Sequence, residues 1–495
     1  MLPLTKTSQL EAHFAPFRQN IVGIDATFRS PYGEMPVIYA DWIASGRLYR
    51  PIEEAIANVF GPMVGNTHSE SSETGRCMTH AYHLAHKIIK QHVNARDTDV
   101  LITCGSGMTG AVAKFQRILG LRIPEKLEKY LDIPREERPV VFITHMEHHS
   151  NQTTWLESIA EVVVLPPDDK LFVDPKLLDE ILPRYADRKM KIGSFSACSN
   201  VTGIMPPYHE LAAIMHKHGG YCFVDFAASA PYVDIDMHPA DPAQKLDAIF
   251  FSPHKFLGGP GSSGVLVFCK SLYHNRIPDH PGGGTVTWTN PWGEHSYFDD
   301  IEIREDGGTP GFLQAIRTAL AIRLKEQMGT GQIHRREKEL IGLAFEALRE
   351  VPGLRILGDG GDERLGVFSF YIEGMHHNLV VRLLNDRYGI QVRGGCSCAG
   401  TYGHFLLNVD REFSKNITDR IDQGDLSLKP GWVRLSLHPT MTNDELALIC
   451  QAIREVAENG REWEQDYEYS CQTNEYYHRS NELQEEDLQA WFELG

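Results

Sequence analysis

The sequence lacks the marks of a membrane protein, a secreted protein or a zinc protein. No apolar run in its 495 residues approaches the roughly eighteen residues that cross a bilayer. Its N-terminal stretch is mixed and polar, without the apolar core of a signal peptide. The nine cysteines are odd in number, scattered and without zinc-ligand spacing. These absences predict a cytoplasmic chain with reduced thiols, no metal and no membrane partner.

Basic residues are fewer than acidic ones. The chain has 48 Lys and Arg against 66 Asp and Glu, a net charge of −18. A nucleic-acid duplex needs a basic face, so this balance argues against nucleic acid as the main partner. The composition, 42% hydrophobic and 23% charged, is that of a globular protein. The length predicts about two to four domains.

The middle of the chain alternates between strand-like and helix-like patterns. Strands that alternate with helices indicate βαβ units, and strands that are apolar throughout indicate a mainly parallel sheet covered on both faces. The last two strand-like runs are joined by a glycine-rich loop without a helix, so we predict that they form an antiparallel edge. The runs are 140–144, 161–165, 191–197, 221–225, 247–251 and 264–268.

A second region begins near residue 320. Two long amphipathic helical patterns, two strand-like runs and a capped final helix predict a smaller α+β domain. The expected division is an N-terminal arm (1–40), a large domain (41–318), a small C-terminal domain (319–461) and a tail (462–495).

The tail is acidic, with Arg479 as its single Lys or Arg. One interpretation is a solvated extension. Its aromatic residues leave a second interpretation open, in which the tail docks on the body of the protein or on a partner. These residues are Trp463, Tyr467, Tyr476, Tyr477, Trp491 and Phe492.

The stretch "FFSPHKFLGG" (250–259) gives the strongest functional signal. It places Ser252, His254 and Lys255 between a buried strand and a glycine pair. A surface lysine needs no such setting. A lysine at a strand end beside a hydroxyl and an imidazole indicates covalent chemistry and a bound anion.

Glycines and histidines follow other strand-like runs. Ser106 and Gly107 lie in a glycine-rich turn before a helix, which suits a phosphate or is a plain tight turn. His145, His148 and His149 follow 140–144. These histidines could bind zinc, could be structural, or could place an imidazole against a flat cofactor ring. Their spacing does not match a zinc motif.

Asp225 ends the run 221–225, where a buried carboxylate is costly unless it is paired. It either caps a helix or balances the charge of a protonated ring nitrogen. A phosphate site, an imidazole, an acid and a lysine together are what pyridoxal phosphate requires.

With these motifs the sequence resembles the class V aminotransferases of fold type I, especially the cysteine desulfurase and selenocysteine lyase group, over roughly residues 35 to 460. The resemblance implies a mostly parallel seven-stranded sheet with helices on both faces. It also implies that Lys255 carries pyridoxal 5'-phosphate, that His148 stacks on the ring and that Asp225 holds the ring nitrogen. The implied phosphate ligands are Ser106, the Gly107 amide, Ser252 and His254.

The resemblance extends to the substrate and the assembly. Asn200 in "SNVTG" would approach the ring hydroxyl, and Arg434 in "WVRLSLH" would bind the substrate carboxylate. Thr309 in "DGGTP" matches a segment that reaches the phosphate of the neighbouring subunit. A homodimer with shared active sites is therefore implied.

The loop "VRGGCSCAGTYGHF" bears on the type of reaction. The resemblance implies that Cys398 is the nucleophile that takes sulfur from cysteine as a persulfide, for transfer to a sulfur acceptor protein. Arg393 lies in the same loop, and its positive charge would favour the Cys398 thiolate. Cys396 replaces a residue that is often histidine. The alternatives are an inert Cys398 in an aminotransferase, epimerase or other lyase of the same fold, or a non-catalytic homologue.

Two positions depart from the family pattern. The acid motif reads Asp225-Phe226-Ala227-Ala228, where the family usually has a glutamine in the last place. The phosphate loop reads "GSGMT" where desulfurases usually have Gly-Thr-Thr-Glu. Both changes weaken the likeness to a housekeeping desulfurase but are compatible with a cofactor site.

Overall fold

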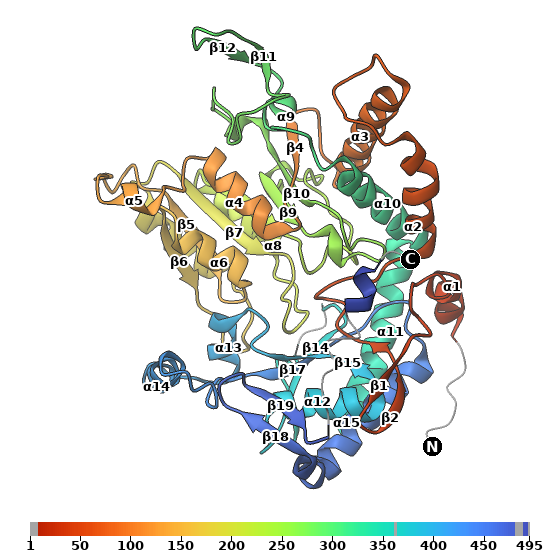
Figure 1. Ribbon diagram of the computed structural model, residues 1–495. Helices are drawn as coiled ribbons and strands as arrows, with labels where there is room; N and C mark the ends of the chain where they lie inside the picture. Colours follow the sequence, from red (N-terminus) through yellow and green to blue (C-terminus); the bar gives the residue numbers. More distant parts are fainter. Residues whose placement is uncertain (1–7, 361–363, 481–488, 494–495) are drawn as a thin grey trace.

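The computed structural model describes residues 8–360, 364–480 and 489–493 (Figure 1). A larger part is built on a central sheet, and a smaller part holds a second sheet formed by the C-terminal third of the chain. This arrangement confirms the predicted α/β fold class.

The central sheet has seven strands and is mostly parallel. Each of the six predicted strand-like runs forms one of them, and β4 is the seventh. In spatial order the strands are β4 (Asp99–Cys104), β10 (Gly264–Cys269), β9 (Ala248–Phe251), β8 (Tyr221–Asp225), β7 (Lys191–Ser196), β5 (Val140–Thr144) and β6 (Glu161–Leu165).

The predicted antiparallel edge is half correct. Strand β10 is antiparallel to β9, as expected, but it also pairs with β4 on its other side, again antiparallel. The edge strand is therefore β4. The glycine-rich loop after Lys255 lets the chain return beside β9 without a helix, and β10 then fills the gap between β9 and β4.

Helices cover both faces of the central sheet, which explains its continuous apolar runs. Val141 and Ile143 of β5 face one core with α4 (Met108–Ile118) and α6 (His149–Leu156). Val140 and Phe142 face the opposite core. The second face is covered by α3 (Glu73–His92), α7 (Pro175–Ile181), α8 (Tyr208–Lys217) and α10 (Phe312–Met328).

The smaller part is an antiparallel sheet with helices packed against it. Its strands, in spatial order, are β13 (Leu354–Ile356), β14 (Val367–Ile372), β17 (Trp432–Ser436) and β16 (Arg393–Gly395). Its main helices are α11 (Thr330–Leu348), α12 (His377–Tyr388) and α15 (Asn443–Trp463).

The N-terminal segment lies against the smaller part. Helix α1 (Gln9–Arg18) packs on α11, and β3 (Ile38–Tyr39) pairs in parallel with β15 (Ile390–Gln391). The predicted boundary between residues 318 and 319 falls within α10, and that between 461 and 462 falls within α15. The other elements are β1 (Thr27–Ser30), β2 (Gly33–Pro36), α2 (Arg50–Ala55), α5 (Glu125–Glu128), β11 (Val286–Thr289), β12 (His295–Tyr297), α9 (Ile301–Arg304), α13 (Gly400–Leu406) and α14 (Arg411–Asp422).

Part of the acidic tail docks on the body of the protein. Strands β18 (Tyr467–Ser470) and β19 (Glu475–His478) form a hairpin against α12. Tyr467 and Tyr476 are buried, and the Tyr467 hydroxyl donates to Asp386 Oδ2 at 3.0 Å. Trp491 and Phe492 are exposed. The acidic residues Glu482, Glu485, Glu486 and Asp487 lie outside the described residues.

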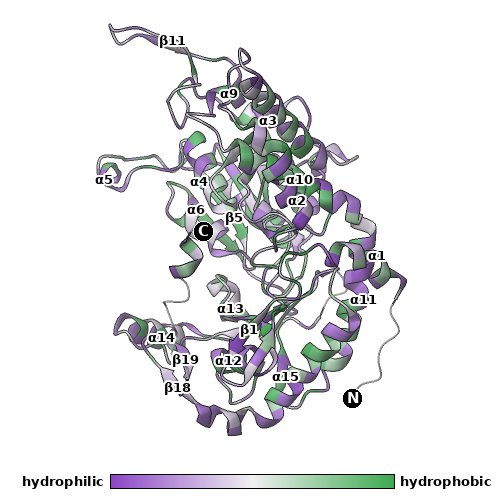
Figure 2. Cartoon of the chain, turned by 45° about the vertical axis from the view of Figure 1, so that its right-hand side comes forward, coloured by the Kyte–Doolittle hydropathy of each residue, from purple (hydrophilic) through white to green (hydrophobic). Residues whose placement is uncertain are grey.

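Surface helices such as α11 and α15 carry hydrophilic and hydrophobic residues on the same segment (Figure 2). Among the described residues, no helix is both long enough and apolar enough to cross a membrane.

Candidate active site

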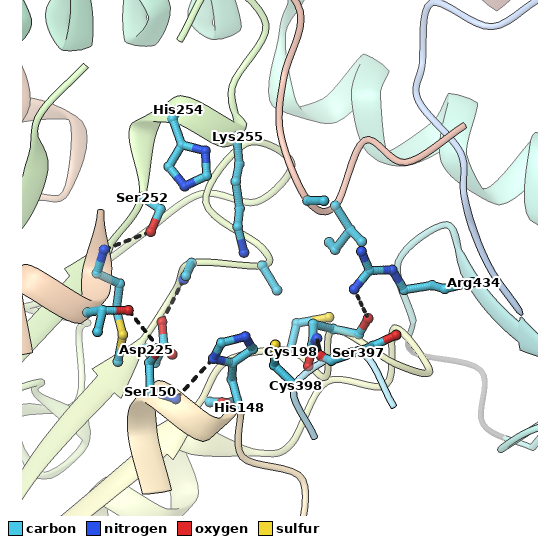
Figure 3. A pocket seen from close by; sticks show the side chains of 18 of the residues that line it. His148, Ser150, Cys198, Asp225, Ser252, His254, Lys255, Ser397, Cys398 and Arg434 are labelled. Carbon is cyan, nitrogen blue, oxygen red and sulfur yellow. Dashed lines mark hydrogen bonds between the residues drawn. The ribbon is translucent and has the colours of Figure 1, made fainter. Parts of the chain in front are cut away.

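A cavity of about 220 Å³ opens at the carboxyl ends of the central strands (Figure 3). Lys255 enters it from one wall, and His148 and Cys398 lie on the opposite wall. The cavity is also bounded by the smaller part through Arg434 of β17. Ligand sites at the carboxyl ends of strands are the rule for open α/β sheets.

Lys255 and Asp225 share this cavity and shift each other's ionisation. Burial lowers the pKa of Lys255 to about 8, and the charge of Asp225 opposes that shift. Burial raises the pKa of Asp225 to about 7, although Ala227 N donates to its Oδ1 at 2.8 Å. Both shifts come mainly from burial, and shifts of this kind gather at functional sites.

Backbone and side-chain donors meet at the start of α4. Met108 N donates to Ser252 Oγ at 2.8 Å. A Cβ on Gly107 would lie 3.0 Å from Ser252 Oγ and 3.5 Å from His254 Nε2, so glycine keeps this corner open. Burial lowers the pKa of His254 to about 4, with the Lys255 charge adding to the shift. A helix start beside a hydroxyl and an imidazole can hold an anion.

His148 is a neutral imidazole at the start of α6. Its Nδ1 accepts a hydrogen bond from Ser150 N at 3.0 Å, which caps the helix. Burial and the nearby Lys255 charge lower the pKa of His148 to about 3. His145 is buried elsewhere, against Tyr402. Among the described residues, no group of three or more His, Cys, Asp or Glu side chains is arranged to hold a metal.

Glu147, which the sequence analysis did not single out, is a buried anchor beneath the site. Its Oε1 accepts from Thr144 Oγ1 at 2.7 Å, and its Oε2 accepts from Ser196 Oγ at 2.6 Å and from Asn151 Nδ2 at 2.7 Å. Burial raises its pKa. The sequence feature that could have identified Glu147 is its position between Thr144, at the end of β5, and His148.

Asp41 is the second residue that sequence reasoning missed. Its Oδ1 accepts from Arg434 Nη2 at 2.7 Å, and its Oδ2 accepts from Arg393 Nε at 3.1 Å. Arg434 is nearly fully buried, and its Nη1 lies 3.4 Å from Asn200 O. Both arginines line the cavity. No local motif pointed to Asp41, because its partners lie far away in the chain.

Cys398 lies in a tightly held loop. Asn200 Nδ2 donates to Ser397 O at 2.7 Å, and His149 N donates to Cys398 O at 2.7 Å. Ser397 and Cys398 both have positive φ, +51° and +56°. Non-glycine residues rarely adopt this conformation, and such strain gathers at functional sites. Cys398 is exposed and lines the cavity.

Most of the predicted site residues meet at this cavity. Its lining includes Lys255, His148, Asn200, Asp225, Ser252, His254, Cys398 and Arg434. Gly107 lies at its margin, beside Ser252. Ser106 and Thr309 are exposed and do not line it, and neither does Cys396. Cys198 does line it, and the sequence analysis did not name this residue.

Residues 38–449 match the family model described as aminotransferase class-V. The chain belongs to this family. A probable cysteine desulfurase of Staphylococcus epidermidis is 30% identical over 369 residues, which cover 73% of this chain and 83% of that protein. One of Halalkalibacterium halodurans is 29% identical over 368 residues, 74% and 84% of the two chains. The predicted resemblance is thereby confirmed, and the chain is a class-V enzyme similar to cysteine desulfurases.

Solved structures of the family share this fold. A cysteine desulfurase from Thermococcus onnurineus aligns with a TM-score of 0.71 at 23% identity, covering 90% of this chain and 98% of that one. The cysteine desulfurase CsdA from Escherichia coli aligns with a TM-score of 0.69 at 24% identity, with the same coverage.

Class-V aminotransferases typically use pyridoxal phosphate, and the site fits this cofactor. Asn200 Oδ1 is buried and has no hydrogen-bond partner among the described residues. The corner at Gly107 is open because glycine has no Cβ. The same corner carries hydrogen-bond donors suited to phosphate. Lys255 supplies an amine that burial makes easier to deprotonate. An acceptor, an anion corner and an amine are what the cofactor requires.

Proposed function

We propose that the protein is a pyridoxal-phosphate enzyme that removes sulfur from cysteine and leaves a persulfide on Cys398. The observation that carries this proposal is that Cys398 and Lys255 line one cavity. The loop bonds from Asn200 and His149 support it, because they hold the thiol at the cavity wall. The family relatives named cysteine desulfurase support it further.

The cofactor would be held by groups on three sides. Ser252, His254 and the start of α4 would bind its phosphate, His148 would lie against its ring, and Asp225 would face its ring nitrogen. When bound, pyridoxal phosphate takes up the electron pair released at the substrate α-carbon. Asp225 would support this as a carboxylate, because a negative charge at that end of the site balances a protonated ring nitrogen.

Each of the following roles then belongs to a residue of the chain. Arg434 binds the substrate carboxylate, since a guanidinium is planar and always charged. Lys255 Nζ takes the α-proton as general base, and its lowered pKa favours the neutral amine. Cys398 Sγ attacks the substrate sulfur, the substrate carbon–sulfur bond breaks, and its electrons go to the β-carbon, which gains the proton that the Cys398 thiol gave up. Lys255 Nζ then returns a proton to the α-carbon. Cysteine and the Cys398 thiol thus become alanine and a Cys398 persulfide.

Two further features belong to the proposal. Thr309 would contact the cofactor phosphate bound in a neighbouring subunit, so the active enzyme would be a homodimer with shared sites. The exposure of Cys398 would let a thiol or an acceptor protein collect the sulfur.

The test is to incubate the cofactor-loaded protein with cysteine and dithiothreitol and to measure sulfide and alanine. We expect equal amounts of both, a visible-edge absorbance band, and attachment of the cofactor to Lys255 after borohydride reduction. Cys398→Ala should abolish sulfide release while the absorbance remains, and Cys396→Ala should change it little, because Cys396 does not line the cavity.

Mass spectrometry after limited turnover should find 32 Da, about one sulfur atom, added to the peptide that holds Cys398. If Cys398→Ala releases sulfide as fast as the wild type, the desulfurase proposal is wrong. An aminotransferase, epimerase or other lyase reaction at Lys255 would then replace it.

A further inference from the structure

Ser397 is a cavity residue whose hydroxyl has no partner among the described residues. It is 8% exposed and lies on the wall that also carries Cys398 and Arg434 (Figure 3). Ser229 and Ser262 have unpaired buried hydroxyls as well, within the same described ranges, but neither lines the cavity. A buried hydroxyl without a partner is costly, and at Ser397 a bound ligand can supply one.

The backbone of Ser397 is held on both sides. Asn200 Nδ2 donates to Ser397 O at 2.7 Å, and His149 N donates to the carbonyl oxygen of Cys398 at 2.7 Å. Ser397 has a φ of +51°, a conformation that residues other than glycine rarely adopt. Such strain persists only where the surrounding structure fixes it. The place of the Ser397 side chain is therefore set before a ligand enters.

Ser397 is linked to Arg434 through Asn200. Arg434 Nη1 donates to Asn200 O at 3.4 Å, and Asn200 Nδ2 in turn donates to Ser397 O. Arg434 Nη2 donates to Asp41 Oδ1 at 2.7 Å. Part of the guanidinium is thus already used inside the protein. Because a carboxylate has two acceptor oxygens, one that binds at Arg434 still has an oxygen for a second donor.

We propose that Ser397 is a substrate-binding residue, whose hydroxyl donates to one oxygen of the substrate α-carboxylate while Arg434 binds the other. Hydrogen bonds to a charged acceptor are stronger than those between neutral groups. A carboxylate held at both oxygens cannot turn about a single contact, which fixes the α-carbon that Lys255 deprotonates. This inference rests on the proposed binding of the carboxylate at Arg434 and adds a residue to it.

Sulfur is the competing acceptor for this hydroxyl. If Ser397 bonded the sulfur of the substrate or of Cys398, it would act in sulfur transfer and not in carboxylate binding. Two ligands separate these roles, alanine and ethylamine. Ethylamine is alanine without its carboxylate, and neither ligand contains sulfur.

The test measures the affinity of the cofactor-loaded protein for each ligand by titration of its absorbance band. Ser397→Ala should weaken alanine binding about tenfold, the effect of one hydrogen bond to a charged group, and should leave ethylamine binding unchanged. Each ligand is compared between variant and wild type, so the different basicity of the two amines cancels. Propionate, which has a carboxylate and no amine, should also lose about tenfold in calorimetry.

Two further variants separate the hydroxyl from strain and from burial. Ser397→Gly lacks the hydroxyl and relieves the strain of a positive φ, so it should weaken alanine binding as Ser397→Ala does. Ser229→Ala is the matched control. Ser229 is fully buried, its Oγ has no partner in the described part of the chain, and it lies outside the cavity lining. This variant should leave the affinities for all three ligands unchanged.

Wild-type affinity for alanine in Ser397→Ala would overturn the inference, and so would an equal loss for alanine and ethylamine. Slower sulfide release with unchanged alanine and propionate binding would assign Ser397 to sulfur transfer and would overturn it as well. Because none of the three ligands contains sulfur, their binding does not depend on whether Cys398 forms a persulfide. A failed desulfurase test and a failed carboxylate test are therefore distinguishable.

Discussion

The backbone nitrogen of His149 donates a hydrogen bond of 2.7 Å to the carbonyl oxygen of Cys398. The His149 ring adds a second link, because its Nε2 accepts from Gly400 N at 2.9 Å. His149 begins the helix that follows His148. The loop of the smaller part that carries the thiol is thereby joined to the wall of the larger part that carries His148.

The ring of His149 should matter for sulfur transfer and not for cofactor binding. His149→Ala removes the acceptor of Gly400 N and loosens the loop, so we expect sulfide release from cysteine to fall about tenfold, the effect of about one lost hydrogen bond. The cofactor absorbance should persist. His149→Gln, which keeps an acceptor, should recover part of the rate. If His149→Ala releases sulfide at the wild-type rate, this role is contradicted.

The reactivity of Lys255 should follow an unusually low pKa. In the cofactor-free protein, acetylation of its Nζ should rise with pH through about 8, whereas an ordinary lysine titrates near about 10.4. Competitive labelling read by mass spectrometry measures this midpoint. Asp225 raises the pKa of Lys255, so Asp225→Asn should move the midpoint lower.

The same shift affects stability, with a defined sign. The folded pKa of Lys255 lies below the unfolded one, so the unfolded chain binds more protons between about pH 8 and 10.4. The free energy of unfolding should therefore gain from this group as pH rises through that window. A Lys255 midpoint at the ordinary lysine value would refute both expectations.

Thr309 should affect the cofactor from a distance. It is exposed and does not line the cavity of its own chain. If it binds the partner's phosphate, Thr309→Ala should speed cofactor loss on dialysis about tenfold, as expected for one charge-assisted hydrogen bond. Thr418→Ala, on the exposed face of α14, is the control. A monomer in sedimentation that keeps full cofactor occupancy would exclude this role.

The docked hairpin should stabilise the smaller part. Tyr476 is 7% exposed and Tyr477 is 42% exposed, although they are neighbours on β19. Tyr476→Ala should lower the free energy of unfolding by about 3 kcal/mol, because it leaves a cavity against α12. Tyr477→Ala should change it by less than about 0.5 kcal/mol. Urea denaturation compares the free energies of unfolding of the two variants. Equal effects would show that the buried Tyr476 contributes no more stability than its exposed neighbour.

Much of the larger part could be predicted because its signals are local. Strands buried on both faces have to be apolar throughout, and each predicted run forms a strand. Lys255 and Asp225 directly follow or end such runs, so their meeting at one edge of the sheet also follows from the parallel order.

The features that the sequence analysis left open or placed only in part depend on distant parts of the chain. The position of β10 inside the sheet depends on β4, which lies more than 150 residues earlier, roughly a domain length. The fate of the acidic tail depended on α12, since Tyr467 finds its partner in Asp386. Neither relation leaves a periodic pattern in the sequence.

The sequence by itself determined the sheet, the family resemblance and the lysine–acid–imidazole set, because each depends on residue type beside a local strand pattern. Only the tertiary structure decided that Asp41 stands between Arg434 and Arg393 and that Glu147 anchors Ser196. A buried carboxylate is stable where its partners happen to converge, and that convergence is a property of the folded chain.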